Sequence, residues 1–198
     1  AEKWLDDLLK YHLIQIGTEN QIQFRHQLLQ EYYAAERLLE ELPRLSDDEL
    51  QWEYLNYLKW TETVALMMQL LDVETQNFAY LRLVKLALEI DWQLGARLAG
   101  EVKVELQQDT VGLVDSLEVA PLLKIRLLRQ TKSEAVILSL IKFLEHEDSF
   151  VRYIAAYALG EIKSETTIPG LIKLLENKDS FLRKIAANSL EKIKTETA

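Results

Sequence analysis

The side chains that could do acid–base or metal chemistry in this sequence are three histidines and several pairs of adjacent carboxylates. His12, His26 and His146 stand on separate segments, with no H-x-x-x-H or H-x-x-E spacing that would place two metal ligands on one helix face. Pairs such as Asp47-Asp48 fall on the surfaces of expected helices, where charged groups are normally solvated. We therefore expect no catalytic residue and no metal site.

Nucleophile and phosphate-binding motifs are also missing from the sequence. There is no Cys, which excludes thiolate ligands and disulfides and is typical of a cytoplasmic protein. The patterns G-x-x-x-x-G-K-[ST], G-x-G-x-x-G and G-x-S-x-G do not occur, so no loop of this chain is expected to cradle a nucleotide by itself. We expect this chain not to be an enzyme and to hold no cofactor alone.

Composition favours a helical globular fold. Among 198 residues there are only 6 Gly and 3 Pro, hydrophobic residues make up 48% and charged residues 28%. The net charge of −9 disfavours nucleic acid as a partner. The only basic stretch, "KIRLLRQTK" at 124–132, alternates with Leu and Ile and is interpreted as the solvated face of a helix. No apolar run reaches the roughly 20 residues of a membrane span.

A repeat occupies the C-terminal third. "SEAVILSLIKFLEHED" (133–148) aligns with "SETTIPGLIKLLENKD" (164–179), and "DSFVRYIAA" at Asp148 returns as "DSFLRKIAA" at Asp179, 31 residues later. Apolar residues in each copy follow the i, i+3, i+4, i+7 spacing of a helix with one buried face. The pattern predicts two units, 133–163 and 164–194. Each has two helices, with the Asp-Ser pair capping the second, whose buried face we expect to include Ile154 and Leu159.

These units resemble HEAT-like repeats, in which a first-helix Pro, a turn Asp and a following Arg recur. Here Pro169, Asp148 and Asp179, and Arg152 and Arg183 occupy those positions, whereas the first unit has Leu138 in place of the Pro. The resemblance implies a mainly α fold, an α-α superhelix extending over 117–198 in which stacked helix pairs bind a protein ligand.

The two copies differ where one repeat would meet the next. Four positions become more polar in the second copy, which is expected where a last repeat offers water the strip that an inner repeat offers its neighbour. We therefore predict that unit 164–194 is a terminal cap. We also predict that Arg152, Tyr153, Tyr157 and Arg183 contact a partner. The four changes are Tyr153 to Lys184, Tyr157 to Asn188, Ala158 to Ser189 and Gly160 to Glu191.

The N-terminal part is helical but not periodic. "LIQIGTENQIQF" (13–24) alternates around Gly-Thr-Glu-Asn and predicts a β-hairpin, followed by a helix that ends at Pro43. Helix, hairpin, helix indicates the second half of a winged-helix domain over 1–45. Ser46 to Glu49 forms a capping box that opens a helical linker domain over 46–116. Further helices are expected at 62–72, 76–89 and 92–107, with Thr61, Thr75 and Asp91 as their caps.

One block near the hairpin carries a second resemblance. "FRHQLLQEYYAA", from Phe24 to Ala35, resembles the segment that closes the winged helix of NACHT-type NTPases of the STAND class, including cyanobacterial members with HEAT-like sensor arrays. The resemblance implies that an ATPase core lies upstream of residue 1, and that ADP or ATP binds there. It also implies that ligand detection leads to nucleotide exchange and oligomerisation, in signalling or defence against phage.

The same resemblance implies that the imidazole of His26 reaches the nucleotide phosphates, through an N–H that donates to a phosphate oxygen. The alternative interpretation of His26 is a structural histidine with its hydrogen bonds satisfied locally. Phe24 and Tyr32 are expected in the core, and Gln30-Glu31 in capping or local pairing.

Two other functions stay open. The chain could be a free-standing HEAT-like scaffold that binds a protein, or a HEAT-like lyase or isomerase acting on bilin chromophores. An upstream Walker A motif would favour the NACHT interpretation, and a coloured complex with added bilin would favour the enzyme.

Overall fold

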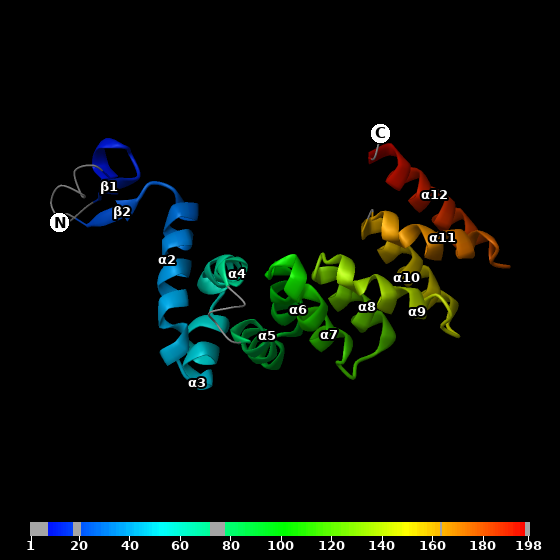
Figure 1. Cartoon of the computed structure of the whole chain (residues 1–198), viewed down its shortest axis with the longest axis horizontal. Helices are drawn as coiled ribbons and strands as arrows, with labels where there is room; N and C mark the ends of the chain where they lie inside the picture. The colour runs from blue at the N-terminus through cyan, green and yellow to red at the C-terminus, as the bar shows by residue number, and fades with distance from the viewer. Residues whose placement is uncertain (1–7, 18–20, 72–77, 163, 197–198) are drawn as a thin grey trace. The chain divides into compact units, whose positions relative to one another are not determined.

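The computed structural model describes residues 8–17, 21–71, 78–162 and 164–196. The chain divides into two compact units, 1–77 and 78–198, which are described separately. Figure 1 shows helices throughout and one small hairpin, so the expected mainly α fold is confirmed. The finer division into domains 1–45, 46–116 and 117–198 stays a prediction.

The first unit begins with the hairpin. Strands β1 (Ile14–Ile16) and β2 (Ile22–Phe24) pair antiparallel, with Ile14 opposite Phe24. Helix α2 (Gln27–Glu41) follows, and it packs against α4 (Thr61–Leu70) through buried residues such as Ala35 and Leu38. The alternation around Gly-Thr-Glu-Asn thus predicted the hairpin correctly.

Between α2 and α4 the chain makes short helical turns. Helix α3 (Asp47–Glu49) has the predicted capping box: the Ser46 hydroxyl accepts from Glu49 N at 3.2 Å, and the Glu49 carboxylate accepts from Ser46 N at 2.8 Å. The chain continues as a π-helical segment, η3 (Leu50–Leu55). The expected cap at Thr61 is wrong, because Thr61 is already the first residue of α4 and Trp60 precedes it without a side-chain cap. Thr75 lies outside the described residues.

The second unit is built of successive packed helices (Figure 1). Neighbouring pairs include α5 with α6, α9 with α10, and α11 with α12, and α10 also packs along α12 of the following repeat. In the described part of either unit, no helix is both long enough and apolar enough to span a membrane. The helices are α5 (Ala79–Ile90), α6 (Trp92–Glu101), α7 (Gln107–Asp115), α8 (Pro121–Gln130), α9 (Ile137–Phe143), α10 (Ser149–Ile162), α11 (Ile168–Leu175) and α12 (Ser180–Glu196).

The expected single helix over 92–107 is wrong. Asp91 caps α6 as predicted, accepting from Gln93 N and Leu94 N at 2.7 and 2.8 Å, but α6 ends at Glu101. The carbonyls of Gly100 and Val102 instead accept hydrogen bonds from the Gln107 side chain, at 2.9 and 3.1 Å. These bonds stabilise a sharp turn into α7 and satisfy carbonyls that a helix end leaves free.

Both repeats fold as the period predicts. Asp148 Oδ1 accepts from Phe150 N at 2.8 Å, and Asp179 Oδ1 accepts from Phe181 N at 2.9 Å, so each Asp caps the second helix of its unit. Leu159 is fully buried in α10, as expected. Ile154 is only half-buried, because it stands at the edge of the packed face and not at its centre.

Candidate protein-binding surface

The two repeat arginines have a structural role. Arg152 Nη1 donates to the carbonyl oxygens of His146 and Glu147, at 2.7 and 2.8 Å. Arg183 repeats the arrangement on the carbonyls of Asn177 and Lys178, at 2.7 and 2.9 Å. Each guanidinium therefore binds the turn that ends the first helix of its unit, where carbonyl groups lack helical partners. Their predicted contact with a partner is not addressed by this geometry and stays a prediction.

Tyr153 joins the two repeats. Its ring stacks on Phe150 at a centroid distance of 6.0 Å and on Phe181 of the next repeat at 5.1 Å. Phe150 and Phe181 are each 55% exposed. The sequence analysis did not single them out, although the signal was present: the same Phe follows Asp-Ser in both copies.

Tyr157 belongs to a cluster that connects α8 to α10. The Arg129 guanidinium carbon lies 5.4 Å from the centre of the Tyr157 ring, and Arg129 Nη2 lies 2.6 Å from Glu161 Oε2. The Tyr157 hydroxyl donates to the Glu161 carboxylate, which lowers the pKa of Glu161 and raises the pKa of Tyr157. Arg129 also helps to lower the pKa of Glu161. The cluster fixes three side chains on the exposed surface of the repeats.

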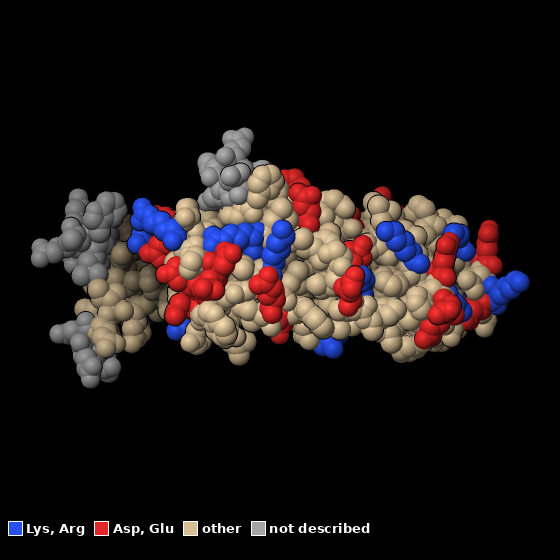
Figure 2. Space-filling model, turned by 90° about the horizontal axis from the view of Figure 1, so that it is seen from below, with Lys and Arg blue, Asp and Glu red and all other residues tan. Residues whose placement is uncertain are grey.

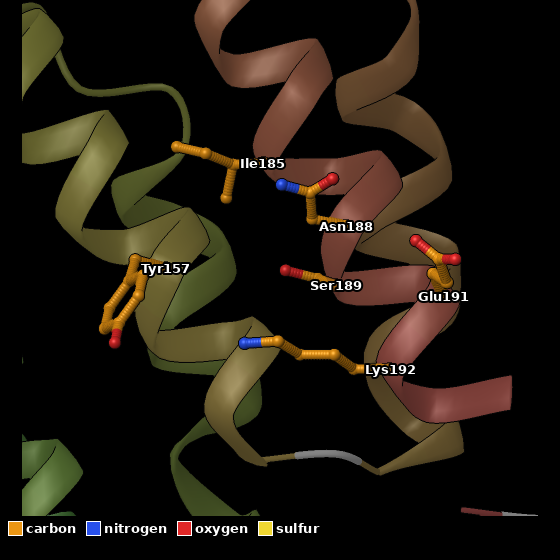
Figure 3. A pocket seen from close by; sticks show the side chains of 6 residues that line it. All are labelled: Tyr157, Ile185, Asn188, Ser189, Glu191 and Lys192. Carbon is orange, nitrogen blue, oxygen red and sulfur yellow. The ribbon is translucent and has the colours of Figure 1, made fainter. Parts of the chain in front are cut away.

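Cavities lie on both sides of this cluster. One of about 660 Å³ is lined by α8 and α10, with Ala158 and Ile162 as apolar lining and charged residues around them. One of about 410 Å³ lies between Tyr157 and α12 (Figure 3). A third, of about 320 Å³, shares Gln130 and Lys132 with the first and reaches α6. We call these three cavities together the second-helix groove, since α8, α10 and α12 supply most of its residues.

The basic stretch 124–132 contributes to the groove only in part. The Lys124 ammonium donates to the Asp115 carbonyl at 2.6 Å, and Arg129 pairs with Glu161. Arg126 and Lys132 are exposed, and neither side chain has a hydrogen bond or ion pair within the described part of the chain. Acidic and basic side chains are interspersed on the face of the molecule seen in Figure 2.

Three of the four positions that become more polar in the second copy are exposed. These are Lys184, Asn188 and Glu191, whereas Ser189 is 6% exposed. Ser189 is buried because it packs on Gly160 of the preceding repeat. Figure 3 shows Asn188, Ser189 and Glu191 on α12, with Tyr157 across the cavity from them. The cap itself stays a prediction.

His26 stands in the first unit at the N-cap of α2. Its side chain is exposed, makes no capping bond and has no hydrogen-bond partner within the described residues. The alternative of a structurally satisfied histidine therefore finds no support in this geometry. A cavity of about 650 Å³ lies beside the start of α2, between Arg25 and Lys59, and His26 does not line it.

Aromatic residues around His26 are more exposed than expected. Phe24 and Tyr32, predicted as core, are 36% and 37% exposed, and that prediction is wrong. Phe24 stacks on Tyr33 at 5.8 Å, but the buried residues of α2, Ala35 and Leu38, lie further along the helix. Glu31 accepts from Gln27 Nε2 at 2.6 Å, so the expected local pairing of this residue is confirmed.

The hairpin and the first turns of α2 together present an apolar surface, which we call the hairpin face. It consists of Ile16, Ile22, Phe24, Leu28, Tyr32 and Tyr33, all of them exposed.

One comparison with known proteins identifies the repeats. The family model of HEAT repeats matches residues 137–198. The C-terminal part of this chain is thus a HEAT-like repeat region, as expected from Asp148, Arg152 and their second copies. No curated protein matches the chain. Within the described residues no three His, Asp or Glu side chains lie together as metal ligands would.

Proposed function

We propose that this chain is a non-catalytic regulatory region of a NACHT-type signalling NTPase, in which the HEAT-like repeats bind a protein ligand and the first unit contacts the nucleotide-binding domain. HEAT repeats are typical of helical protein-interaction scaffolds, so the binding role rests on the family match at 137–198. The regulatory role rests on the first unit.

The hairpin face is the single observation that carries the regulatory role. Soluble proteins rarely leave a contiguous group of large apolar side chains in water unless the surface binds something. In the sequence, His26, the residue that the resemblance assigns to the nucleotide phosphates, lies between Phe24 and Leu28 of this surface. Ile22, Leu28 and Tyr33 are 57%, 66% and 47% exposed, so a domain covering them would remove considerable apolar area from water.

An exposed, unpaired imidazole suits a phosphate contact. A ring N–H can donate to a phosphate oxygen and lose that bond when the domains separate. His26 also lies at the start of the 15-residue helix α2, where free backbone N–H groups favour a nearby negative charge. ADP would thus be held partly by His26 in the closed protein, and release of ADP would accompany opening and oligomerisation.

A decisive first test is the coding sequence upstream of Ala1. The proposal requires a Walker A motif, G-x-x-x-x-G-K-[ST], in the same reading frame. Its absence would leave the second candidate, a free-standing scaffold, which is favoured by the HEAT match alone. In that case the hairpin face would bind a separate protein.

A further inference from the structure

The lining of the second-helix groove suggests which kind of protein segment it accepts. Ile162 is half-buried and supplies an apolar floor to the cavity between α8 and α10, whereas Ala158 in the same lining is fully buried. Charged side chains stand around this floor. An apolar floor with charged edges fits an amphipathic segment, whose apolar side is buried while its polar sides meet the edges.

Three cations line this cavity. Arg126, Arg129 and Lys132 recur at every third residue, and all three line the same cavity. Glu161 neutralises the middle one at 2.6 Å. The side chains of Arg126 and Lys132 have no hydrogen-bond or ion-pair partner within the described residues; Arg126 lies on α8, whereas Lys132 follows the end of that helix with a positive φ of 53°.

We infer that the second-helix groove binds an acidic amphipathic helix of a partner protein, with two of its carboxylates facing Arg126 and Lys132. Apolar residues of that helix, between these carboxylates, then face Ile162. The inference rests on the proposed ligand-binding role of the repeats and adds the chemistry of the ligand.

The same groove is poorly suited to nucleic acid. Glu134 and Glu161 line the cavity together with the cations, and the chain has a net charge of −9. A phosphate backbone would meet both carboxylates, whereas a helix can direct its few acidic residues toward the cations alone.

A selection from a phage-displayed library of random 16-residue peptides on the whole chain tests this inference. Enriched peptides are expected to carry two Asp or Glu residues with Leu, Ile or Phe between them. The charge-reversal variant Arg126→Glu with Lys132→Glu should weaken the best synthetic peptide at least tenfold in fluorescence anisotropy. Replacing the two acidic residues of that peptide by Gln or Asn should weaken wild-type binding similarly.

A matched control is Lys85→Glu with Lys178→Glu, which adds the same negative charge at two exposed sites outside the groove. This control should bind the peptide as wild type does, and both variants should keep the wild-type circular-dichroism spectrum. Equal loss in the control would mean that net charge, and not the groove, governs binding, and would overturn the inference.

The remaining outcomes separate this inference from the proposed function. Enriched peptides without acidic pairs, whose binding is lost in a Tyr157→Arg variant, would overturn the acidic ligand but keep the groove as a protein-binding site. If no peptide were enriched, or if no groove variant affected the binding of any enriched peptide, both this inference and the proposed ligand-binding role of the repeats would be contradicted. Tighter binding of a 20-nucleotide single-stranded DNA than of any peptide, abolished by Arg126→Glu with Lys132→Glu, would replace the peptide by nucleic acid.

Discussion

Gly160 of α10 packs directly on Ser189 of α12, so closely that a Cβ atom on Gly160 would overlap the Ser189 hydroxyl. The contact joins one repeat to the next. It explains two features together. The inner copy has Gly at this position, and Ser189 is buried although it is a polar residue where the inner copy has Ala158.

Replacing Gly160 by Ala should therefore destabilise the repeats, because α10 and α12 must move apart or strain the Ser189 rotamer. We expect the free energy of unfolding to fall by about 1–3 kcal/mol, the usual cost of overpacking. Urea denaturation followed by circular dichroism measures it. Gly112 of α7 is the matched control, since a Cβ there meets nothing within 4 Å. Gly112→Ala should raise helix stability by up to about 1 kcal/mol. Equal effects of the two substitutions would show that the Gly160 contact is unimportant.

Leu159 should be among the most sensitive positions of the repeats. It is fully buried in α10, and truncation of such a side chain to Ala costs about 2–5 kcal/mol through lost burial and the cavity left behind. Lys184→Ala should change the free energy of unfolding by less than about 0.5 kcal/mol, because its side chain is exposed. The same urea titration compares them. If Lys184→Ala proved as costly as Leu159→Ala, then Lys184 would not face water.

The Glu161 cluster should make stability depend on pH. The pKa of the Glu161 carboxyl lies below the usual 4.5. The stability that the ionised carboxylate contributes is therefore fully present above that pH and is lost as the pH falls through the lowered pKa. Glu161→Gln should therefore destabilise the chain at pH 7 by about 0.5 kcal/mol, a small effect because the pair is partly exposed, and by less at pH 3. Glu118→Gln, at an exposed carboxylate, should show no such convergence. A constant difference between wild type and Glu161→Gln from pH 7 to pH 3 would contradict the assigned role.

The repeats could be predicted from sequence because their determinants are local. Asp148 and Asp179 cap helices whose apolar spacing is visible in either copy, and the turns that follow are stabilised by neighbouring residues such as Arg152. Helices α9 to α12 therefore fold where the 31-residue period places them.

Features that depend on distant residues could not be predicted in the same way. The end of α6 is stabilised by the Gln107 side chain, and no Pro or Gly follows Glu101 to mark it. The Arg129–Glu161 pair joins residues 32 positions apart, on the surface and without any motif.

Burial is hard to predict for the same reason. Phe24 and Tyr32 are aromatic residues of the kind found in cores, but whether a side chain is covered depends on which element packs over it, and the buried residues of α2 are Ala35 and Leu38.

The most direct test of the proposed function is the rate of ADP release from the longer protein that includes the nucleotide-binding domain. We expect His26→Ala to release ADP about 10- to 100-fold faster than wild type, since a hydrogen bond to a charged group contributes about 1.5–3 kcal/mol. His12→Asn, at a second exposed histidine of the first unit, should release ADP at the wild-type rate. Equal rates for wild type and His26→Ala, or a longer protein that binds no ADP, would contradict the proposal.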